Sequence, residues 1–145
     1  MALDVLSLGQ VRIHSGSATR EEAMKEAADI LESAGAVTSR YYDAMQQREQ
    51  TVSTYMGMEL AIPHGTNETK AEILASALSI TRYDGGVDWG GEPVTFVVGI
   101  AGRGDEHLEI LSKIAILFSD DSEVQRLKAA QSPEELFEIV SAAGV

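Results

Sequence analysis

The segment Val94–Ala101, VTFVVGIA, is a nearly continuous run of apolar residues. A short run of this kind is typical of a strand, and the near absence of polar residues means that both faces of the strand are covered. Sheets with covered faces occur where helices pack on them. The segment therefore predicts a central strand in a layered α/β fold.

Strand and helix patterns alternate along the rest of the chain. Further strands are predicted at 8–13, 59–62 and 76–83, and helices at 19–34, 39–50, 105–118, from 122 and from 132. Turn residues are dense in the segment 84–93, DGGVDWGGEP. We expect one domain, residues 1–145, folded as an α/β sandwich in which helices flank a mixed sheet of about five strands.

Several helix starts carry capping residues. Thr19 with Glu22 three positions later forms a capping box, and Gly35 ends that helix. The other predicted caps are Ser39, Ser122 with Gln125, and Ser132 followed by Pro133 and Glu135. In the second helix, Tyr41, Ala44 and Met45 are expected to face inward, with Arg48 one turn beyond Ala44.

The amino-acid composition argues against several classes of function. The chain has 145 residues and no cysteine, which excludes disulfides, thiolate zinc sites and a cysteine nucleophile. The net charge of −12 opposes binding to nucleic acid or to an anionic membrane, and it suits either solubility or a basic protein partner. The start of the chain lacks the pattern of a signal peptide, and no segment approaches the roughly 20 apolar residues of a membrane helix. We expect a cytoplasmic protein with no direct membrane insertion.

The three histidines, at positions 14, 64 and 107, differ in their surroundings. His14 lies in a polar stretch and is expected to be a solvated loop residue. His64 follows Pro63 at a predicted strand end, where α/β folds often hold reactive groups, although a turn histidine without a role has the same pattern. His107 begins a predicted helix, where backbone amides bind anions, or it faces water there as an ordinary polar residue.

Other chemistries have little support. The histidines lack the close spacing of a metalloprotease helix, and no G-x-S-x-G elbow or Walker motif is present. We expect no bound metal. A metal-dependent hydrolase is kept as an alternative that stoichiometric zinc in the purified protein would reveal.

The run EQTVSTYMGMELAIPHG, residues 49–65, resembles the active-site signature of one family. This family is the enzyme IIA domains, mannitol/fructose class, of the bacterial phosphoenolpyruvate-dependent sugar phosphotransferase system. The shared positions are Glu49, Met56, Gly57, Leu60, Ala61, Ile62, Pro63, His64 and Gly65. The resemblance covers nearly the whole chain, and the block GDEHLEIL, residues 104–111, is similar to the mannitol branch.

The resemblance implies a function and a set of site residues. His64 would accept a phosphoryl group on Nε2 from the phosphocarrier HPr and pass it to a cysteine of an enzyme IIB domain. His107 would be the second active-site histidine and Arg48 a phosphate-stabilising cation, and Glu59 is also carried over from the signature. No cofactor is required, because the side chains and backbone amides provide the stabilisation.

The resemblance also implies partners and one alternative. The IIB cysteine and the IIC membrane transporter are absent from these residues, so they belong to separate polypeptides or were removed, and mannitol as the sugar rests on likeness to the family. The alternative is a nitrogen-type or fructose-type IIA whose phosphorylation state regulates protein partners. Four apolar residues would form a docking rim near His64 if they are exposed, and would otherwise be core: Met56, Met58, Ile62 and Leu108.

Overall fold

The computed structural model describes residues 5–145, apart from the side chain of Asn67. Within this range a six-stranded sheet has the order β1-β5-β6-β4-β3, with β2 also paired to β5. The strands are β1 (Val11–His14), β2 (Ala18–Thr19), β3 (Tyr55–Gly57), β4 (Leu60–Ala61), β5 (Ala77–Trp89) and β6 (Glu92–Ala101). Parallel and antiparallel pairs both occur, which confirms the predicted mixed sheet.

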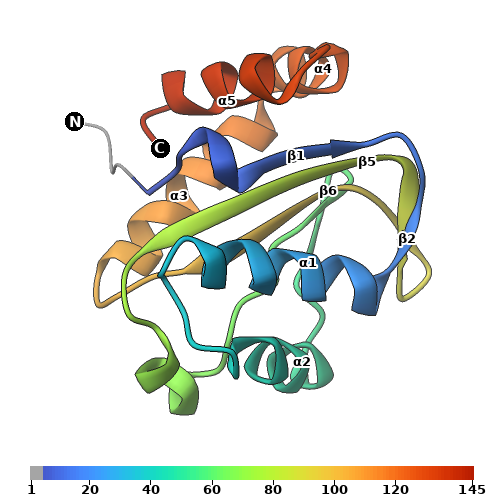
Figure 1. Ribbon diagram of the computed structural model, residues 1–145. Coiled ribbons are helices and arrows are strands. Elements are labelled where there is room, and N and C mark those ends of the chain that lie inside the picture. The colour runs from blue at the N-terminus through green and yellow to red at the C-terminus, as the bar shows by residue number, and fades with distance from the viewer. Residues whose placement is uncertain (1–4) are drawn as a thin grey trace.

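Helices cover both faces of the sheet (Figure 1). On one face lie α1 (Arg20–Ser33) and α2 (Tyr41–Thr51); on the other lie α3 (Glu106–Ser119), α4 (Asp121–Ala129) and α5 (Pro133–Ala142). Of two short 3₁₀-helices, Leu8–Gln10 directly precedes β1 and Asn67–Glu72 lies between β4 and β5. The predicted α/β sandwich is therefore confirmed.

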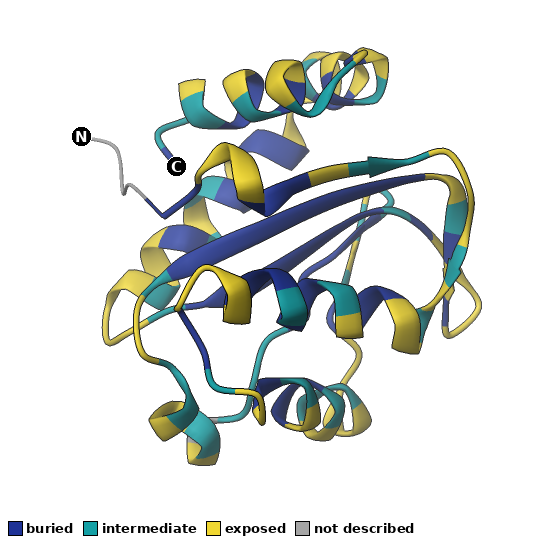
Figure 2. Cartoon of the chain, viewed as in Figure 1, coloured by how far each residue is buried: buried dark blue, intermediate teal, exposed yellow. Residues whose placement is uncertain are grey.

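The central strand β6 supplies both cores of the domain. Phe96, Val98 and Ile100 belong to the cluster under α3, α4 and α5, whereas Val97 and Ala101 belong to the cluster under α1 and α2. Buried residues run along the strands and the inward helix faces, and exposed residues cover the outer faces (Figure 2). This alternation confirms that the apolar run at 94–101 is a strand covered on both sides.

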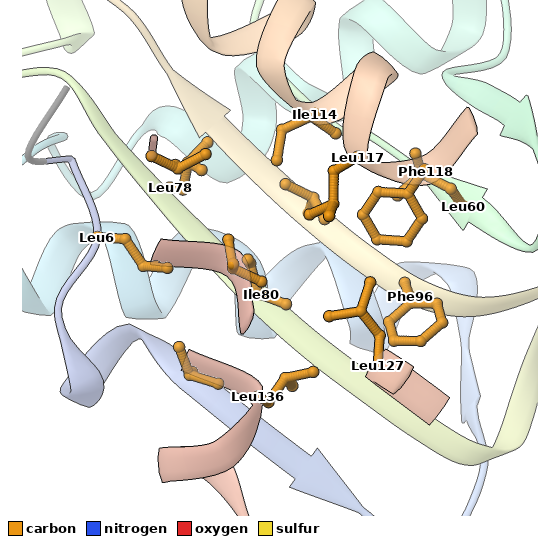
Figure 3. Packing of buried hydrophobic residues seen from close by; sticks show 14 of the residues in the cluster. Leu6, Leu60, Leu78, Ile80, Phe96, Ile114, Leu117, Phe118, Leu127 and Leu136 are labelled. Carbon is orange, nitrogen blue, oxygen red and sulfur yellow. The ribbon is translucent and has the colours of Figure 1, made fainter. Parts of the chain in front are cut away.

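Phe96 is fully buried, and its ring meets the ring of Phe118 edge-on at a centroid distance of 5.3 Å (Figure 3). We expect Phe96→Ala to lower the free energy of unfolding by about 3–5 kcal/mol, because it removes a buried ring and leaves a cavity. Urea unfolding followed by circular dichroism measures this loss. Ile116→Ala is the control, because Ile116 is 67% exposed; an equal loss in both variants would contradict the burial of Phe96 between the sheet and α3.

The helix caps agree with the sequence in two cases and differ in two. Thr19 and Glu22 form the predicted capping box, and the Ser132 hydroxyl accepts the Glu135 N–H at the start of α5. Ser39 is not a cap, because α2 begins after Arg40 and the Tyr41 N–H donates to the Thr38 carbonyl instead. The cap of α4 is Asp120, whose carboxylate accepts two amides of the first turn, so Ser122 lies inside the helix.

Two strands differ from the prediction in extent. The first begins at Val11, because the Gln10 side chain donates to the carbonyls of Val5 and Leu78 and residues 8–10 form a 3₁₀-turn. The strand β5 continues through the predicted turn to Trp89. A Cβ on Gly85 would lie 2.6 Å from the backbone at 16–17, so only a glycine lets the two backbones pass this close. The pairing of β5 with β6 shifts register between Arg82 and Val87, around this glycine. The chain turns only at Gly90–Gly91.

The predicted strand at 59–62 is also shorter than expected. Met58 and Glu59 have φ values of 54° and 61° and form a tight connection between β3 and β4, so β4 is only Leu60–Ala61. Both residues lie in the left-handed region, which costs roughly 1 kcal/mol or more for each non-glycine residue. Contacts of Glu59 with the rest of the domain must offset this cost.

Candidate functional site

A cleft of about 610 Å³ opens where β4 and β6 end and α3 begins. His64, His107 and Arg48 all line it, so the structure brings together three of the four residues predicted to form the site. They come from three separate parts of the fold: the loop after β4, the first turn of α3, and α2.

The loop that carries His64 is fixed to the sheet. The Ile62 N–H donates to the Thr54 carbonyl, and the Pro63 carbonyl accepts the Ile100 N–H at 3.0 Å. The Nδ1 atom of His64 lies 2.8 Å from the Ile62 carbonyl oxygen. A carbonyl only accepts hydrogen bonds, so Nδ1 carries the proton and the neutral ring has its lone pair on Nε2.

Gly65 is required by close packing. A Cβ at this position would lie 2.8 Å from the Tyr41 ring and 2.8 Å from the Thr69 hydroxyl oxygen. The Gly65 N–H donates to the Tyr41 hydroxyl at 2.9 Å. The glycine beside His64 therefore lets the loop lie directly against α2, and its backbone φ is not in the left-handed region.

His107 faces His64 from the opposite side of the cleft. It is the second residue of α3, and the two imidazole centroids are 5.3 Å apart with an angle of 57° between the rings. Gly102 makes this approach possible, because a Cβ there would lie 2.5 Å from the Cα of His107. The first turn of α3 also carries the positive end of the helix dipole, which favours an anion in the cleft.

Two cationic side chains border the cleft. Arg48 on α2 donates from Nη1 to the Val52 carbonyl at 2.6 Å, which uses one of its five N–H donors. Lys70, from the 3₁₀-helix Asn67–Glu72, also lines the cleft. Sequence reasoning missed Lys70, and the available signal was a lysine in the loop that follows the PHG motif.

Glu59 does not line the cleft. It precedes β4, whereas His64 follows the opposite end of that strand. Its carboxylate accepts from the Thr95 hydroxyl at 2.6 Å and forms an ion pair with Lys128, and its backbone carbonyl accepts two amides of β6. Lys128 and Thr95 hold the pKa of Glu59 below its ordinary value. These contacts offset the strained backbone of the β3–β4 connection.

Both cleft histidines titrate below the ordinary value of 6.5. Burial lowers the pKa of His64 most; Arg48, and His107 once it is protonated, lower it further, against the opposing effects of the Ile62 carbonyl and Glu49. Burial, followed by the charge of Lys70, lowers the pKa of His107. Both rings are therefore neutral at pH 7, and a neutral imidazole is a nucleophile.

We expect NMR titrations of both rings to have midpoints below 6.5. Between that value and the lowered pKa the unfolded chain binds more protons than the folded one, so the free energy of unfolding decreases as the pH falls through this window. Urea unfolding at about pH 7.5 and about pH 5.5 measures the loss. In a double variant, His64→Gln with His107→Gln, the free energy of unfolding should fall less between these two pH values than in the wild type. An equal fall in both proteins, or an NMR titration midpoint at or above 6.5, would contradict the burial of these rings.

The prediction for His14 is wrong in placing it in a loop, although its side chain is half-exposed. This residue ends β1 and lies on the Tyr83 ring, with a centroid distance of 5.3 Å. Its Nε2 is 2.8 Å from a Glu26 carboxylate oxygen, and Arg12 and Tyr83 bind the same carboxylate. The sequence near His14 did not reveal these partners, because α1 and β5 provide them.

The predicted docking rim is only partly exposed. Ile62 is 5% exposed and belongs to the core, which contradicts its place in the rim. Met56 and Met58 are exposed, but Met58 lies in the β3–β4 connection at the far end of β4. Leu108 is 68% exposed and lines the cleft beside His107, so it is the member of the rim that the structure brings to His64.

Over residues 5–145 the structure has neither a cluster of side chains that could bind a metal ion nor a helix that could span a membrane. In that range no three His, Cys, Asp or Glu side chains lie close enough together to hold a metal ion. None of the helices there combines the length and the apolar character needed to span a bilayer.

The fold and the cleft define a class: a single α/β domain that presents a neutral histidine beside a second histidine and two cations. Residues 4–143 match the family described as "Phosphoenolpyruvate-dependent sugar phosphotransferase system, EIIA 2". The chain belongs to this family and is a IIA component of the phosphotransferase system. The predicted family is thereby confirmed.

Curated relatives and solved structures agree with this membership. A protein of Halalkalibacterium halodurans named "Mannitol-specific phosphotransferase enzyme IIA component" is 44% identical over 136 residues, 94% of either chain. A Staphylococcus aureus protein of the same name is 50% identical over 121 residues, 83% of this chain and 84% of that one. The crystal structure of IIA mannitol from Escherichia coli has a TM-score of 0.84 and 33% identity, covering 93% of this chain and 98% of that one.

A second Escherichia coli structure is a complex of enzyme IIAMTL and phosphorylated enzyme IIBMTL. It has a TM-score of 0.86 and 31% identity, and covers 94% of this chain and 97% of the matched chain. The nitrogen regulatory protein IIA-Ntr of Neisseria meningitidis has a TM-score of 0.81 and 26% identity, and covers 94% of this chain and 97% of that one. Identity alone does not separate the two kinds of relative, because the mannitol-specific cryptic phosphotransferase enzyme IIA CmtB of Escherichia coli is 22% identical, with a TM-score of 0.78 over 94% of this chain and 95% of that one.

Proposed function

We propose that the chain is the IIA phosphocarrier of a mannitol phosphotransferase system and that His64 is its phosphoryl acceptor. The observation that carries the proposal is the hydrogen bond between Nδ1 of His64 and the Ile62 carbonyl. It leaves the lone pair on Nε2 of a ring that lines the cleft and is neutral at pH 7. This is the atom that the family resemblance implies as the nucleophile.

The reaction runs as two phosphoryl transfers. In the first, the Nε2 lone pair of His64 attacks the phosphorus of phospho-HPr, the new P–N bond forms, and the P–N bond to the HPr histidine breaks. In the second, a IIB cysteine thiolate attacks the same phosphorus, and the P–Nε2 bond breaks as a P–S bond forms. Nδ1 of His64 keeps its proton throughout, because its hydrogen bond to Ile62 is not part of either step.

The lining of the cleft supplies the stabilisation that these transfers require. The equatorial oxygens of the phosphoryl group carry the negative charge in the transition state, so fixed donors around them lower the barrier. The candidates are Arg48, Lys70, the His107 ring and the first turn of α3. The Gly65 amide is not available, because it donates to Tyr41.

The partners follow from the transfer sequence. HPr is the donor, and the acceptor is an enzyme IIB domain that serves a IIC membrane transporter, which puts this chain in the cytoplasm. The names of the relatives at 44% and 50% identity support mannitol as the sugar. The cleft of this chain binds a phosphoryl group, so sugar selection belongs to the partners.

Incubation with phosphoenolpyruvate, enzyme I and HPr tests the proposal. We expect one acid-labile, base-stable phosphoryl group per chain, with NMR showing substitution at Nε2, and rapid onward transfer to a mannitol-type IIB domain. A folded chain that takes no label would overturn the phosphocarrier role. Substitution at Nδ1 would overturn the assignment of the proton to Nδ1 and of the lone pair to Nε2.

The same experiment separates transport from regulation. A regulatory IIA would take the label but hold it, because its phosphorylated state acts as a switch for protein partners. Label that passes to no mannitol-type or fructose-type IIB domain would favour that alternative. Transfer to a fructose-type domain in preference to the mannitol-type one would replace mannitol with fructose.

A further inference from the structure

The Tyr41 hydroxyl joins two segments that meet at the cleft. It donates to the Ile100 carbonyl at 2.7 Å, and it accepts the Gly65 N–H at 2.9 Å. Ile100 belongs to the central strand β6, and Gly65 follows His64 directly. Burial raises the pKa of Tyr41 to about 12, so the hydroxyl keeps its proton and both hydrogen bonds over the physiological range.

Tyr41 also shares a helix with Arg48. The two residues are two turns apart on α2, so they lie on the same side of that helix, and both line the cleft. The helix is therefore tied to the His64 loop at one point and presents a cation to the cleft at another. The distance between the Arg48 guanidinium and the His64 ring depends on how α2 sits against the loop.

We infer that Tyr41 is a positioning residue for phosphoryl transfer, whose hydroxyl holds α2 against the His64 loop and so sets the place of Arg48 relative to Nε2 of His64. The inference rests on the proposed function. The ring of Tyr41 is core for the fold, and a Cβ on Gly65 would meet it at 2.8 Å. The hydroxyl is the part of the side chain that acts on the site.

The substitution Tyr41→Phe removes the hydroxyl and keeps the ring. We expect the rate constant for transfer from saturating phospho-HPr to fall by about 10- to 100-fold, because small misplacements of a stabilising group have effects of that size. The KM for phospho-HPr should change little, because the hydroxyl is buried away from the surface that HPr meets. A wild-type rate in Tyr41→Phe would overturn the inference.

Tyr83→Phe is the matched control. Tyr83 is also buried and its hydroxyl also has a hydrogen-bond partner, Glu26, but neither residue lines the cleft. Both substitutions delete one buried hydroxyl, so a general loss of stability affects both proteins. Urea unfolding measures that loss. An equal fall in transfer rate in both variants would show a structural effect only and would overturn the positioning role.

A double variant tests whether Tyr41 acts through Arg48. If the hydroxyl positions the guanidinium, then Arg48→Gln should lower the transfer rate constant by a much smaller factor in the Tyr41→Phe background than in the wild type. The reason is that the two substitutions remove one shared effect. Fully multiplicative rate losses would show that the two residues act independently. That result would overturn the inference even where each single variant is slow.

NMR of the unphosphorylated protein separates this inference from the proposed function. In Tyr41→Phe the proton signals of the His64 ring should show a smaller share of the Nδ1–H tautomer and a pKa closer to 6.5, whereas Tyr83→Phe should leave both unchanged. This readout needs no phosphoryl donor. A wild-type protein that takes no label contradicts the function, and an unchanged His64 ring in Tyr41→Phe contradicts the positioning role.

Discussion

His64→Ala is expected to abolish phosphorylation by the phosphoenolpyruvate, enzyme I and HPr system while leaving the domain folded. The alanine removes the imidazole and its Nε2 lone pair, and His107 is the one other imidazole among the residues that line the cleft. The loop keeps the hydrogen bonds from the Ile62 N–H to the Thr54 carbonyl and from the Ile100 N–H to the Pro63 carbonyl, because neither involves the imidazole. The measurement is incorporation of label from phosphoenolpyruvate, with circular dichroism to verify the fold.

His14→Ala is the control for this experiment. His14 is half-exposed and bound to Glu26, outside the cleft, so its loss should leave the label unchanged. Full labelling of His64→Ala would assign the phosphoryl group to another residue. The next variant would then be His107→Ala, because His107 is the other neutral imidazole in the cleft.

The second large effect is expected at Arg48. Arg48→Gln should slow phosphoryl transfer by about 10²–10³-fold, because it removes a fixed positive charge from the place where the transition state carries negative charge. Rapid-quench measurement of transfer from phospho-HPr gives the rate. Arg48→Lys should recover part of the loss, because lysine restores the charge but not the planar arrangement of donors.

Arg103→Gln is a close control for Arg48→Gln. Arg103 also donates from Nη1 to one backbone carbonyl, that of Leu74 at 3.0 Å, but its side chain is not part of the cleft lining. Its loss should change the transfer rate by less than about twofold. Equal effects at Arg48 and Arg103 would mean that the net charge of the domain, and not a cation in the cleft, controls the rate.

The sequence predicted those parts of the fold that depend on local patterns. The apolar run at 94–101, the capping box at Thr19 and the cap at Ser132 are each set by neighbouring residues, and all are confirmed. The extent of β5 was not predictable in this way. Gly85 resembles a turn residue in the sequence, but the chain at 16–17 passes so close to it that only a glycine fits within a continuing strand.

In the candidate site, too, the sequence predicted what depends on neighbouring residues and missed what depends on distant ones. His64 is marked by its own neighbours, and the motif that contains it predicted its position at a strand end. Tyr41 was predicted only to face inward, because the two partners of its hydroxyl, Gly65 and Ile100, lie far away in the sequence. Lys70 lies just after the motif, but its place beside Arg48 and His107 depends on how distant segments pack. For Glu59 the motif gave no hint that its partners would be Lys128 and Thr95, at the other end of β4.

The cleft takes residues from every layer of the sandwich: Arg48 from the helices on one face, His64 from the end of the sheet, and His107 from the helices on the other face. A chain in which either helical layer has not yet docked therefore has a histidine without its neighbours. On the proposed function, we expect such a chain to accept the phosphoryl group poorly until both helical layers have packed on the sheet.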